Sequence, residues 1–301
     1  MDEISVVIPV FNREQLIIRC LDSVKAQTHR PIRVIVVDNG STDGTVAAVS
    51  RWIETNASGD FRADLFTESK PGAAAARNRG LREVTTDRVM FFDSDDTMRP
   101  RLVETVAREL TPDLDMIYWK TVEHRASGDF VRAFSTRNLL ERQAYNAMLD
   151  TQGMAVKTEF LRRVGEWEER ALVWNDWELG LRLLKNNPRI KGVAEILVDI
   201  YPQKVSITGE THAEKAGQWE TTLDLVEAMA AGDRRLIRMV IYRRLNLAAL
   251  YRREGREDLA RPLLAGVLAR KELGPLDRLK ARLIYHFTSR GGRGAYLLWK
   301  A

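Results

Sequence analysis

Four apolar segments in the first hundred residues alternate with segments of helical character. Apolar runs without polar alternation are typical of strands that are covered on both faces, as in parallel sheets. Parallel strands need long crossover connections, which helices usually supply. The sequence therefore predicts an α/β fold with a mostly parallel sheet flanked by helices. The expected strands are 4–10, 33–37, 64–66 and 88–92, and the expected helices are 15–26, 42–52 and one that begins after residue 71.

The second half of the chain is less regular and ends in helices. Strands are expected at 115–119 and 196–201, a helix is expected at 139–149, and every segment from Ala213 onward has helical character, with glycines at the breaks. At 301 residues the chain exceeds the usual size of one domain. We therefore expect a sheet domain over 1–212 and a basic α-helical C-terminal region over 213–301.

The net charge of +5 is concentrated in this helical region. From residue 213 onward there are 18 Lys and Arg against 10 Asp and Glu, which leaves 29 against 32 for the part before it. A solvated helical face is the common explanation of such a surplus, and we expect no nucleic acid partner. The arginines around 234–235, 243–244 and 252–253 could also lie on an anionic membrane, or the helices could pair two subunits in a homodimer.

Composition excludes several classes of protein. No apolar run approaches the roughly 18 to 20 residues that span a bilayer, and the acidic start lacks the features of a signal peptide. We therefore expect a cytoplasmic protein that could be peripheral on the inner face of the membrane. The only cysteine, Cys20, lies in an apolar helical stretch. Disulfides within the chain and thiolate metal sites are excluded, and Cys20 is expected in the core.

Three carboxylates within four residues, at Asp93, Asp95 and Asp96, follow the fourth apolar segment directly. Their mutual repulsion calls for a positive partner. Mg²⁺ or Mn²⁺ fits, because such ions take hard oxygen ligands and are often held by one or two carboxylates plus the phosphates of a substrate. The alternative is a solvated helix cap, with Pro100 in the first turn of the helix.

Two further loops follow apolar segments. Asp38 stands at the end of the second one, where its carboxylate could accept the imide hydrogen of a nucleobase. The small residues of 71–76 allow a nucleotide or a neighbouring helix to approach the backbone, and Arg77 comes next. Taken alone, each loop is explained equally well by ordinary turn formation or close helix packing. Dinucleotide-binding and triphosphate-binding glycine motifs do not occur.

Taken together, the four motifs resemble those of family 2 glycosyltransferases, which are inverting enzymes of the GT-A fold. The motifs stand in the family's order within the first hundred residues, and their combination is far more specific than any one of them. They are SVVIPVFN at 5–12, VVDNGSTDGT at 36–45, GAAAARNRG at 72–80 and FFDSDD at 91–96.

The resemblance implies roles for individual residues. It places Pro9, Phe11 and Asp38 around the nucleobase of a nucleotide-sugar donor, with a UDP-sugar favoured. Arg77 would lie near the nucleotide. Asp93 would face the ribose and the metal, and Asp95 would be the principal ligand of a Mn²⁺ or Mg²⁺ cofactor.

A weaker resemblance continues into the second half of the chain. The segment around 174–179 is similar to the family's acceptor segment, in which a Glu-Asp pair opens a helix and the Asp is the base. Here Asn175 replaces the Glu, so Asp176 is the candidate base. A helix start lowers the pKa of a carboxylate, whereas burial against Trp174 and Trp177 would raise it. Trp167, Trp174 and Trp177 could also stack on a sugar ring, although core packing is the favoured use of at least one of them.

The closing segment of the family is similar to 201–208 and often carries a histidine near the donor phosphates. This sequence has Gln203 and Lys204 there, so Lys204 is expected to supply positive charge to the diphosphate. The expected activity is transfer of a sugar to a carbohydrate or lipid-linked acceptor, in polysaccharide or glycoconjugate biosynthesis. The alternatives are a sugar nucleotidyltransferase and a non-catalytic scaffold that binds nucleotide sugars.

Overall fold

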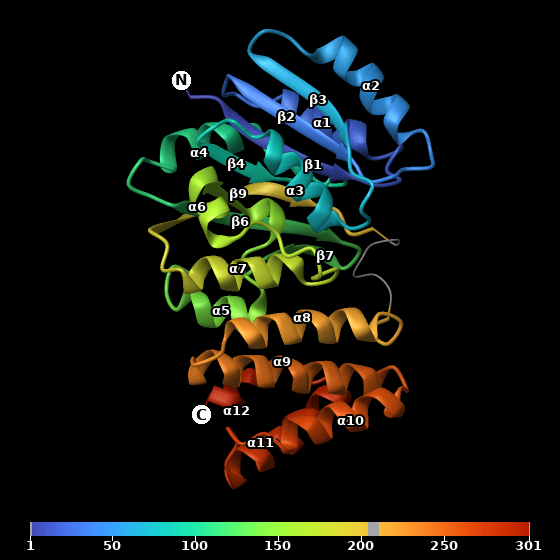
Figure 1. Cartoon of the computed structure of the whole chain (residues 1–301), viewed down its shortest axis with the longest axis vertical. Coiled ribbons are helices and arrows are strands. Elements are labelled where there is room, and N and C mark those ends of the chain that lie inside the picture. Colours follow the sequence, from blue (N-terminus) through green and yellow to red (C-terminus); the bar gives the residue numbers. More distant parts are fainter. Residues whose placement is uncertain (1, 204–210, 301) are drawn as a thin grey trace. The chain divides into compact units, whose positions relative to one another are not determined.

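The computed structural model describes residues 2–203 and 211–300, which form two compact units (Figure 1). We call them the sheet unit and the helical unit, and each is described by itself. The predicted boundary between residues 212 and 213 stays a prediction. Among the described residues, the sheet unit comprises 2–139, 148–169 and 175–203, and the helical unit comprises 140–147, 170–174 and 211–300.

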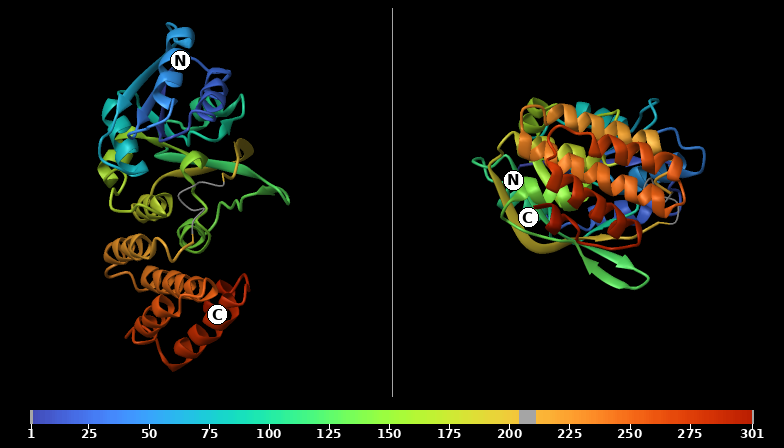
Figure 2. Two further views of the ribbon diagram at one scale, coloured as in Figure 1. Left: turned by 90° about the vertical axis from the view of Figure 1, so that its right-hand side faces the viewer. Right: turned by 90° about the horizontal axis from the view of Figure 1, so that it is seen from below.

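The sheet unit is built on one mixed sheet with the strand order β3-β2-β1-β4-β8-β6-β9-β5. The first four of these strands are parallel, while β8 is antiparallel to both β4 and β6. A short strand, β7, pairs with β6 in a hairpin that projects from the sheet (Figure 2). The strands are β1 (Ile4–Val10), β2 (Ile32–Asp38), β3 (Phe61–Thr67), β4 (Arg88–Phe91), β5 (Thr97–Met98), β6 (Met116–Arg125), β7 (Gly128–Val131), β8 (Met154–Lys157) and β9 (Ile190–Ile200).

Helices cover both faces of the parallel part, which confirms the predicted α/β fold. On one face, α1, α2 and α4 contribute to a buried apolar cluster that includes Ile4, Val6 and Ile8 of β1. Cys20 of α1 belongs to this cluster and has no exposed surface, as expected. On the other face, α3 packs against β1 and β2. The helices of this unit are α1 (Ile17–Lys25), α2 (Thr45–Asn56), α3 (Ala73–Glu83), α4 (Leu102–Glu109), α6 (Thr158–Val164) and α7 (Asn175–Lys185), with a 3-10 turn η1 (Thr151–Gly153).

Gly80 sets the distance between α3 and the sheet. A Cβ atom at this position would lie 2.4 Å from Cγ1 of Val7 and 3.2 Å from Cγ2 of Val37. Both valines are fully buried, so neither side chain can move aside freely. The small residues expected to allow close approach therefore serve helix packing at this point.

Gly80→Ala is expected to lower the free energy of unfolding by about 1–3 kcal/mol, because the added methyl group overpacks a closed core. Urea denaturation followed by circular dichroism would measure the change. Gly59→Ala is the matched control, since a Cβ there meets nothing within 4 Å. Equal stability of the two variants would contradict this account of α3 packing.

The helical unit is organised around its longest helix, α9, which packs against α8, α10 and α11. Asp233 caps α9 by accepting a hydrogen bond of 2.9 Å from the Leu236 amide. Gly232 and Gly255 adopt positive φ angles next to its two ends, as the predicted breaks require. The helices are α5 (Leu139–Asn146), α8 (Ala216–Met229), α9 (Arg234–Arg253), α10 (Glu257–Leu268), α11 (Pro275–Ser289) and α12 (Tyr296–Lys300).

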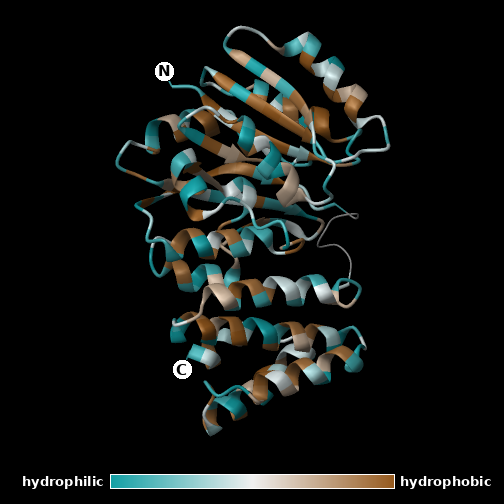
Figure 3. Ribbon diagram, viewed as in Figure 1, coloured by the Kyte–Doolittle hydropathy of each residue, from teal (hydrophilic) through white to brown (hydrophobic). Residues whose placement is uncertain are grey.

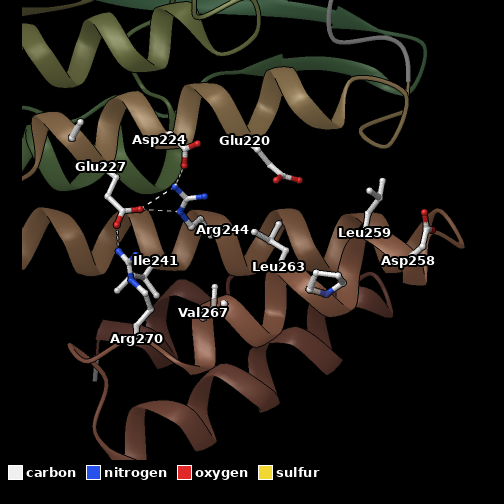
Figure 4. A pocket seen from close by; sticks show the side chains of 13 residues that line it. Glu220, Asp224, Glu227, Ile241, Arg244, Asp258, Leu259, Leu263, Val267 and Arg270 are labelled. Atoms are coloured by element: carbon white, nitrogen blue, oxygen red, sulfur yellow. Dashed lines mark hydrogen bonds and ion pairs between the residues drawn. The ribbon is translucent and has the colours of Figure 1, made fainter.

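A cavity of about 640 Å³ lies within this unit, between α8, α9 and α10 (Figure 4). Ion pairs connect these elements across it, because Glu227 of α8 accepts from both Arg244 of α9 and Arg270, which lies two residues beyond the end of α10 (Figure 4). Asp224 also pairs with Arg244. The cavity contains none of the predicted site residues, and its charged groups fix the helices to one another.

The described residues include no helix that is long and apolar enough to cross a membrane. The strongly apolar segments are instead the central strands β1 and β2, as the hydropathy colours show (Figure 3).

Candidate active site

The loops that follow β1, β2 and β4 lie at one edge of the sheet, because these neighbouring strands are parallel. The chain runs outward from β1 to β3 and then returns to place β4 on the other side of β1. Such a reversal opens a crevice beyond the carboxyl ends of the strands, where ligands bind in open α/β sheets. Asn12 joins two of the loops. Its backbone N–H donates to Ser41 Oγ at 2.9 Å, and its side-chain Oδ1 accepts from the backbone N–H of Thr42 at 2.8 Å.

The three residues expected around a nucleobase are neighbours at this edge. Pro9 is buried within β1, and the next residue in β1, Val10, pairs in register with Asp38 of β2. Phe11 follows immediately and is 53% exposed, so its ring is available to a ligand. The Asp38 carboxylate is buried and accepts hydrogen bonds from the amides of Gly40 and Ser41, at 3.1 Å for the closest oxygen, which orients it.

None of the acids of 93–96 caps a helix, so the helix-cap alternative is wrong. The strand β5 follows them, and α4 begins only at Leu102. Asp96 is buried and accepts from Gln152 Nε2 at 2.6 Å and from the Tyr201 amide at 2.9 Å. Burial, reinforced by Asp93, raises the pKa of Asp96 to about 9. Asp96 therefore connects β4 to the rest of the sheet unit, and Asp93 and Asp95 remain for a ligand.

Asp93 and Asp95 each face an arginine. Arg77 Nη2 donates to Asp93 Oδ1 at 2.8 Å, and Arg13 Nε lies 3.5 Å from Asp95 Oδ2. Burial and then the charge of Asp93 nevertheless raise the pKa of Asp95, so the arginines leave the carboxylates short of positive charge. The two carboxylates are hard oxygen donors whose negative charge is not fully compensated, so they suit a divalent cation.

Arg77 is held on the aromatic face of Trp167. Its side chain is buried, its guanidinium carbon lies 4.4 Å from the ring centroid, and Nη1 donates to Asn175 Oδ1 at 3.2 Å. Its Nε has no hydrogen-bond partner among the described residues. The buried Trp167 and Trp177 belong to the core, and Trp174 packs against Trp219 in the helical unit. The suggestion that Trp167 or Trp177 stacks on a sugar is therefore wrong.

Asp176 lies in the first turn of α7 and is partly buried. Its Oδ1 accepts from the Trp177 amide at 2.7 Å. Desolvation raises the pKa of this carboxyl, while the charges of Arg132 and Arg77 and the backbone hydrogen bond oppose the rise. Burial therefore outweighs the helix start. A carboxylate with a raised pKa is a better proton acceptor than an ordinary one.

Arg132 and Asp150, which were not predicted from the sequence, belong to the same group of charges. Arg132 Nη1 lies 3.2 Å from Asp150 Oδ2, and Thr121 Oγ1 donates to the same oxygen at 3.1 Å. Desolvation raises the pKa of the buried Asp150, and the charge of Asp176 adds to the rise. A sequence signal exists only for Asp150, in the polar run 150–153 directly before the apolar strand β8.

The described part of the closing segment ends at Gln203. Lys204 lies outside the described residues, and Gln203 donates to the Tyr201 carbonyl at 2.8 Å. His212 belongs to the helical unit, where its Nδ1 bonds Glu254 at 2.8 Å.

Comparison with known proteins connects this geometry to a family. A family model described as "Glycosyl transferase family 2" matches residues 5–164, which is more than half of the chain. The chain belongs to glycosyl transferase family 2. The match covers all four motifs at the edge of the sheet and ends before Asp176. The resemblance of the first hundred residues is therefore confirmed, and the role of Asp176 stays a prediction.

Several proteins named as glycosyltransferases are similar to this family 2 member. "Glycosyltransferase GlyA" of Streptococcus pneumoniae is 36% identical over 109 residues, which are 36% of this chain and 15% of that protein. "Uncharacterized glycosyltransferase YibD" of Escherichia coli is 32% identical over 116 residues, which are 38% of this chain and 33% of that protein. The matches thus span about a third or less of these relatives.

Solved structures share the fold over almost the whole chain. S. aureus TarS 1-349 in complex with UDP-GlcNAc superposes with a TM-score of 0.72 at 17% identity, covering 96% of this chain and 87% of that one. The mannosyltransferase PcManGT from Pyrobaculum calidifontis, in complex with GDP-Man and Mn²⁺, superposes with a TM-score of 0.61 at 21% sequence identity. The match covers 95% of this chain and 83% of that one. The family 2 chain therefore has the GT-A fold with an additional α-helical C-terminal region, as predicted.

Proposed function

We propose that this protein transfers a sugar from a nucleotide-diphosphate donor to an acceptor hydroxyl, with inversion at the anomeric carbon. The observation that carries the proposal is the grouping of Asp93, Asp95 and Arg77 at the crevice, with Asp176 close enough to interact electrostatically with Asp93 and Arg77. Such a transfer needs groups that bind the leaving diphosphate and a group that accepts the proton of the acceptor hydroxyl. The acceptor oxygen attacks the anomeric carbon, the bond to the diphosphate breaks, and the acceptor proton passes to Asp176.

A UDP-sugar is the donor that we favour. The Asp38 carboxylate, oriented by the backbone of its own loop, suits the imide N–H of uracil, and the exposed Phe11 ring offers a surface for the base. The buried Pro9 of β1 lies two residues before Phe11, and we assign it to the same base-binding edge. The complex of the structural neighbour TarS with UDP-GlcNAc supports the same nucleotide.

We propose that Asp95 and Asp93 hold Mn²⁺ or Mg²⁺ together with the donor diphosphate. The ion, when bound, neutralises charge that develops on the leaving diphosphate. Arg77 complements it as a buried cation beside Asp93, with an Nε that has no hydrogen-bond partner among the described residues. The Mn²⁺ in the PcManGT complex supports this assignment, and Lys204 stays a predicted further source of positive charge.

Asp176 acts as the base in this proposal, and Asn175 takes the place of the family's glutamate without adding a charge. Asn175 accepts from Arg77, so it fixes the start of α7 against the donor side of the site. The acceptor class, carbohydrate or lipid-linked, stays a prediction from the sequence. So do the polysaccharide or glycoconjugate pathway, the cytoplasmic location and the homodimer.

Arg132→Met is expected to move the rising limb of kcat/KM against pH to higher pH, by up to about one pH unit. Arg132 is the strongest charge that favours the ionised form of Asp176, so its removal raises the pKa of that carboxyl further. The measurement is a pH profile of initial rates at low donor concentration. Arg137→Met is the control, because Arg137 is exposed and forms no ion pair with a described carboxylate. An unchanged pH profile for Arg132→Met would show that Arg132 does not affect the ionisation of the catalytic base.

A binding screen tests the proposed function directly. Isothermal titration with UDP-, dTDP- and GDP-sugars, with and without Mn²⁺, is expected to show binding of one nucleotide class that strengthens with the metal. The absence of metal-dependent binding to every nucleotide sugar would overturn the proposal. Product analysis separates the alternatives: release of pyrophosphate would indicate a nucleotidyltransferase, and binding without any donor hydrolysis or transfer would indicate a scaffold.

A further inference from the structure

Helix α11 of the helical unit exposes a continuous apolar face. Four large side chains, each 52% to 64% exposed, recur at intervals of three, four and four residues and so share one side of the helix. We call them the α11 stripe. The exposed Leu297 and Leu298 of α12 add to the apolar surface of the same C-terminal segment. The α11 stripe consists of Leu276, Leu279, Leu283 and Phe287.

The opposite face of α11 already supplies what the helical unit needs for its own core. Ala281, Ile284 and Tyr285 are buried, and α11 packs against α9. Asp277 accepts from both terminal nitrogens of Arg238 at 2.9 Å, which fixes the start of α11 to α9. The α11 stripe is therefore additional to the apolar face that folding uses, and exposed stripes of this kind mark interaction surfaces.

Positive charge borders the α11 stripe on both sides. Lys280 follows Leu279 and Arg282 precedes Leu283, and the helical rotation of about 100° per residue places them at opposite edges of the stripe. Residues 271–300 carry seven Lys and Arg against two Asp and Glu. Asp277, one of the two acids, is already paired with Arg238. Arg282 forms no ion pair with any described carboxylate, so its charge is available to a partner.

The arginines of α9, which the sequence suggested for membrane contact, are largely committed inside the helical unit. Arg235 pairs with Glu141, Arg244 with Asp224 and Glu227, and Arg243 lies over the Trp174 ring. Arg234 and Arg253 are exposed and form no ion pair with a described carboxylate, but α9 exposes no large apolar side chain beside them, whereas α11 combines cations with an apolar stripe.

We propose that α11 is a docking surface for an anionic lipid membrane, with the α11 stripe inserted among the acyl chains near the headgroups and Lys280 and Arg282 on the lipid phosphates. An apolar stripe bordered by cations is the pattern of helices that lie in the membrane interface. Two copies of this face would bring their lysines and arginines together without compensation, whereas anionic headgroups match both the stripe and its border. The proposal does not depend on the proposed sugar transfer.

Flotation of the whole 301-residue chain with phosphatidylglycerol–phosphatidylcholine vesicles tests the proposal at low salt. The wild type is expected to bind these vesicles at least about tenfold better than vesicles of phosphatidylcholine alone. The double variants Leu279→Ser with Leu283→Ser, and Lys280→Glu with Arg282→Glu, are each expected to weaken binding at least about tenfold. Circular dichroism and thermal melting report separately on folding, so loss of vesicle binding by a variant that melts as the wild type does locates the effect in α11.

Matched controls come from exposed residues elsewhere. Val46→Ser with Val131→Ser removes two exposed apolar side chains, and Arg51→Glu with Arg253→Glu makes the same change in net charge. Both controls are expected to bind as the wild type does. Vesicle binding equal to that of phosphatidylcholine alone would overturn the proposal. So would equal losses in the controls, or a dimer, seen by light scattering, that Leu279→Ser with Leu283→Ser dissociates while vesicle binding persists.

Discussion

Asp95→Asn is expected to lower turnover by about 10²–10³-fold with donor and Mn²⁺ present at wild-type saturating concentrations. The amide keeps the size of the carboxylate and part of its hydrogen bonding, so the loss reports its charge. Asp95 lies in the crevice, 3.5 Å from Arg13, and is the carboxylate to which we assign the cation. Steady-state rates give the loss, and a Mn²⁺ titration followed by electron paramagnetic resonance shows whether metal affinity falls with it.

Stability separates this role from a structural one. Burial and Asp93 raise the folded-state pKa of Asp95, so its ionisation costs stability as the pH rises from the ordinary carboxyl range through that pKa. Without metal at neutral pH, Asp95→Asn is therefore expected to melt no lower than the wild type. Asp60→Asn, in an exposed turn, is the control. A lower melting temperature with unchanged Mn²⁺ affinity would assign Asp95 to the framework instead.

The sequence predicted those parts of the fold that depend on local pattern. The runs at 4–10 and 33–37 are apolar except at Ser5 and Arg33 because β1 and β2 are covered on both faces, and the strands match the expectation within one residue. The acids after β4 were recognisable because charge follows an apolar strand abruptly. The site at this edge follows from parallel pairing, which is itself a consequence of the helical crossovers.

Other features depend on contacts that the local sequence does not show. The short strands β5 and β7 were not predicted. β5 has only two residues, and all four residues of β7 are exposed, so neither shows an alternation of apolar and polar residues. Arg132, just after β7, pairs with an aspartate 18 residues further on, and nothing in its own segment indicates that partner. The sequence offered Trp167, Trp174 and Trp177 for stacking on a sugar and favoured core packing for at least one of them, and only the burial of Trp167 beneath Arg77 assigns it to the core.

Asp176→Asn is expected to lower kcat by about 10²–10⁴-fold while the donor still binds, because the variant loses the group that takes the acceptor proton. Asp176 interacts electrostatically with Arg77 and Asp93, which we assign to the donor, and with Arg132. A proton acceptor near the donor-binding groups suits a base that acts on an acceptor hydroxyl. Rates of transfer and titration of the donor, measured on the same preparation, separate the loss of chemistry from a loss of binding.

The pH dependence of the wild type tests the same assignment. Because desolvation raises the pKa of Asp176, the base is protonated at a pH where an ordinary aspartate is already ionised. We therefore expect kcat/KM to rise with pH through a value above the usual carboxyl range, and Asp176→Asn to abolish that limb. Stability has the opposite sign, since ionising this group costs free energy as the pH rises, so the variant should melt no lower at neutral pH. A retained limb in Asp176→Asn, or a loss of activity matched by a loss of donor binding, would place the base elsewhere.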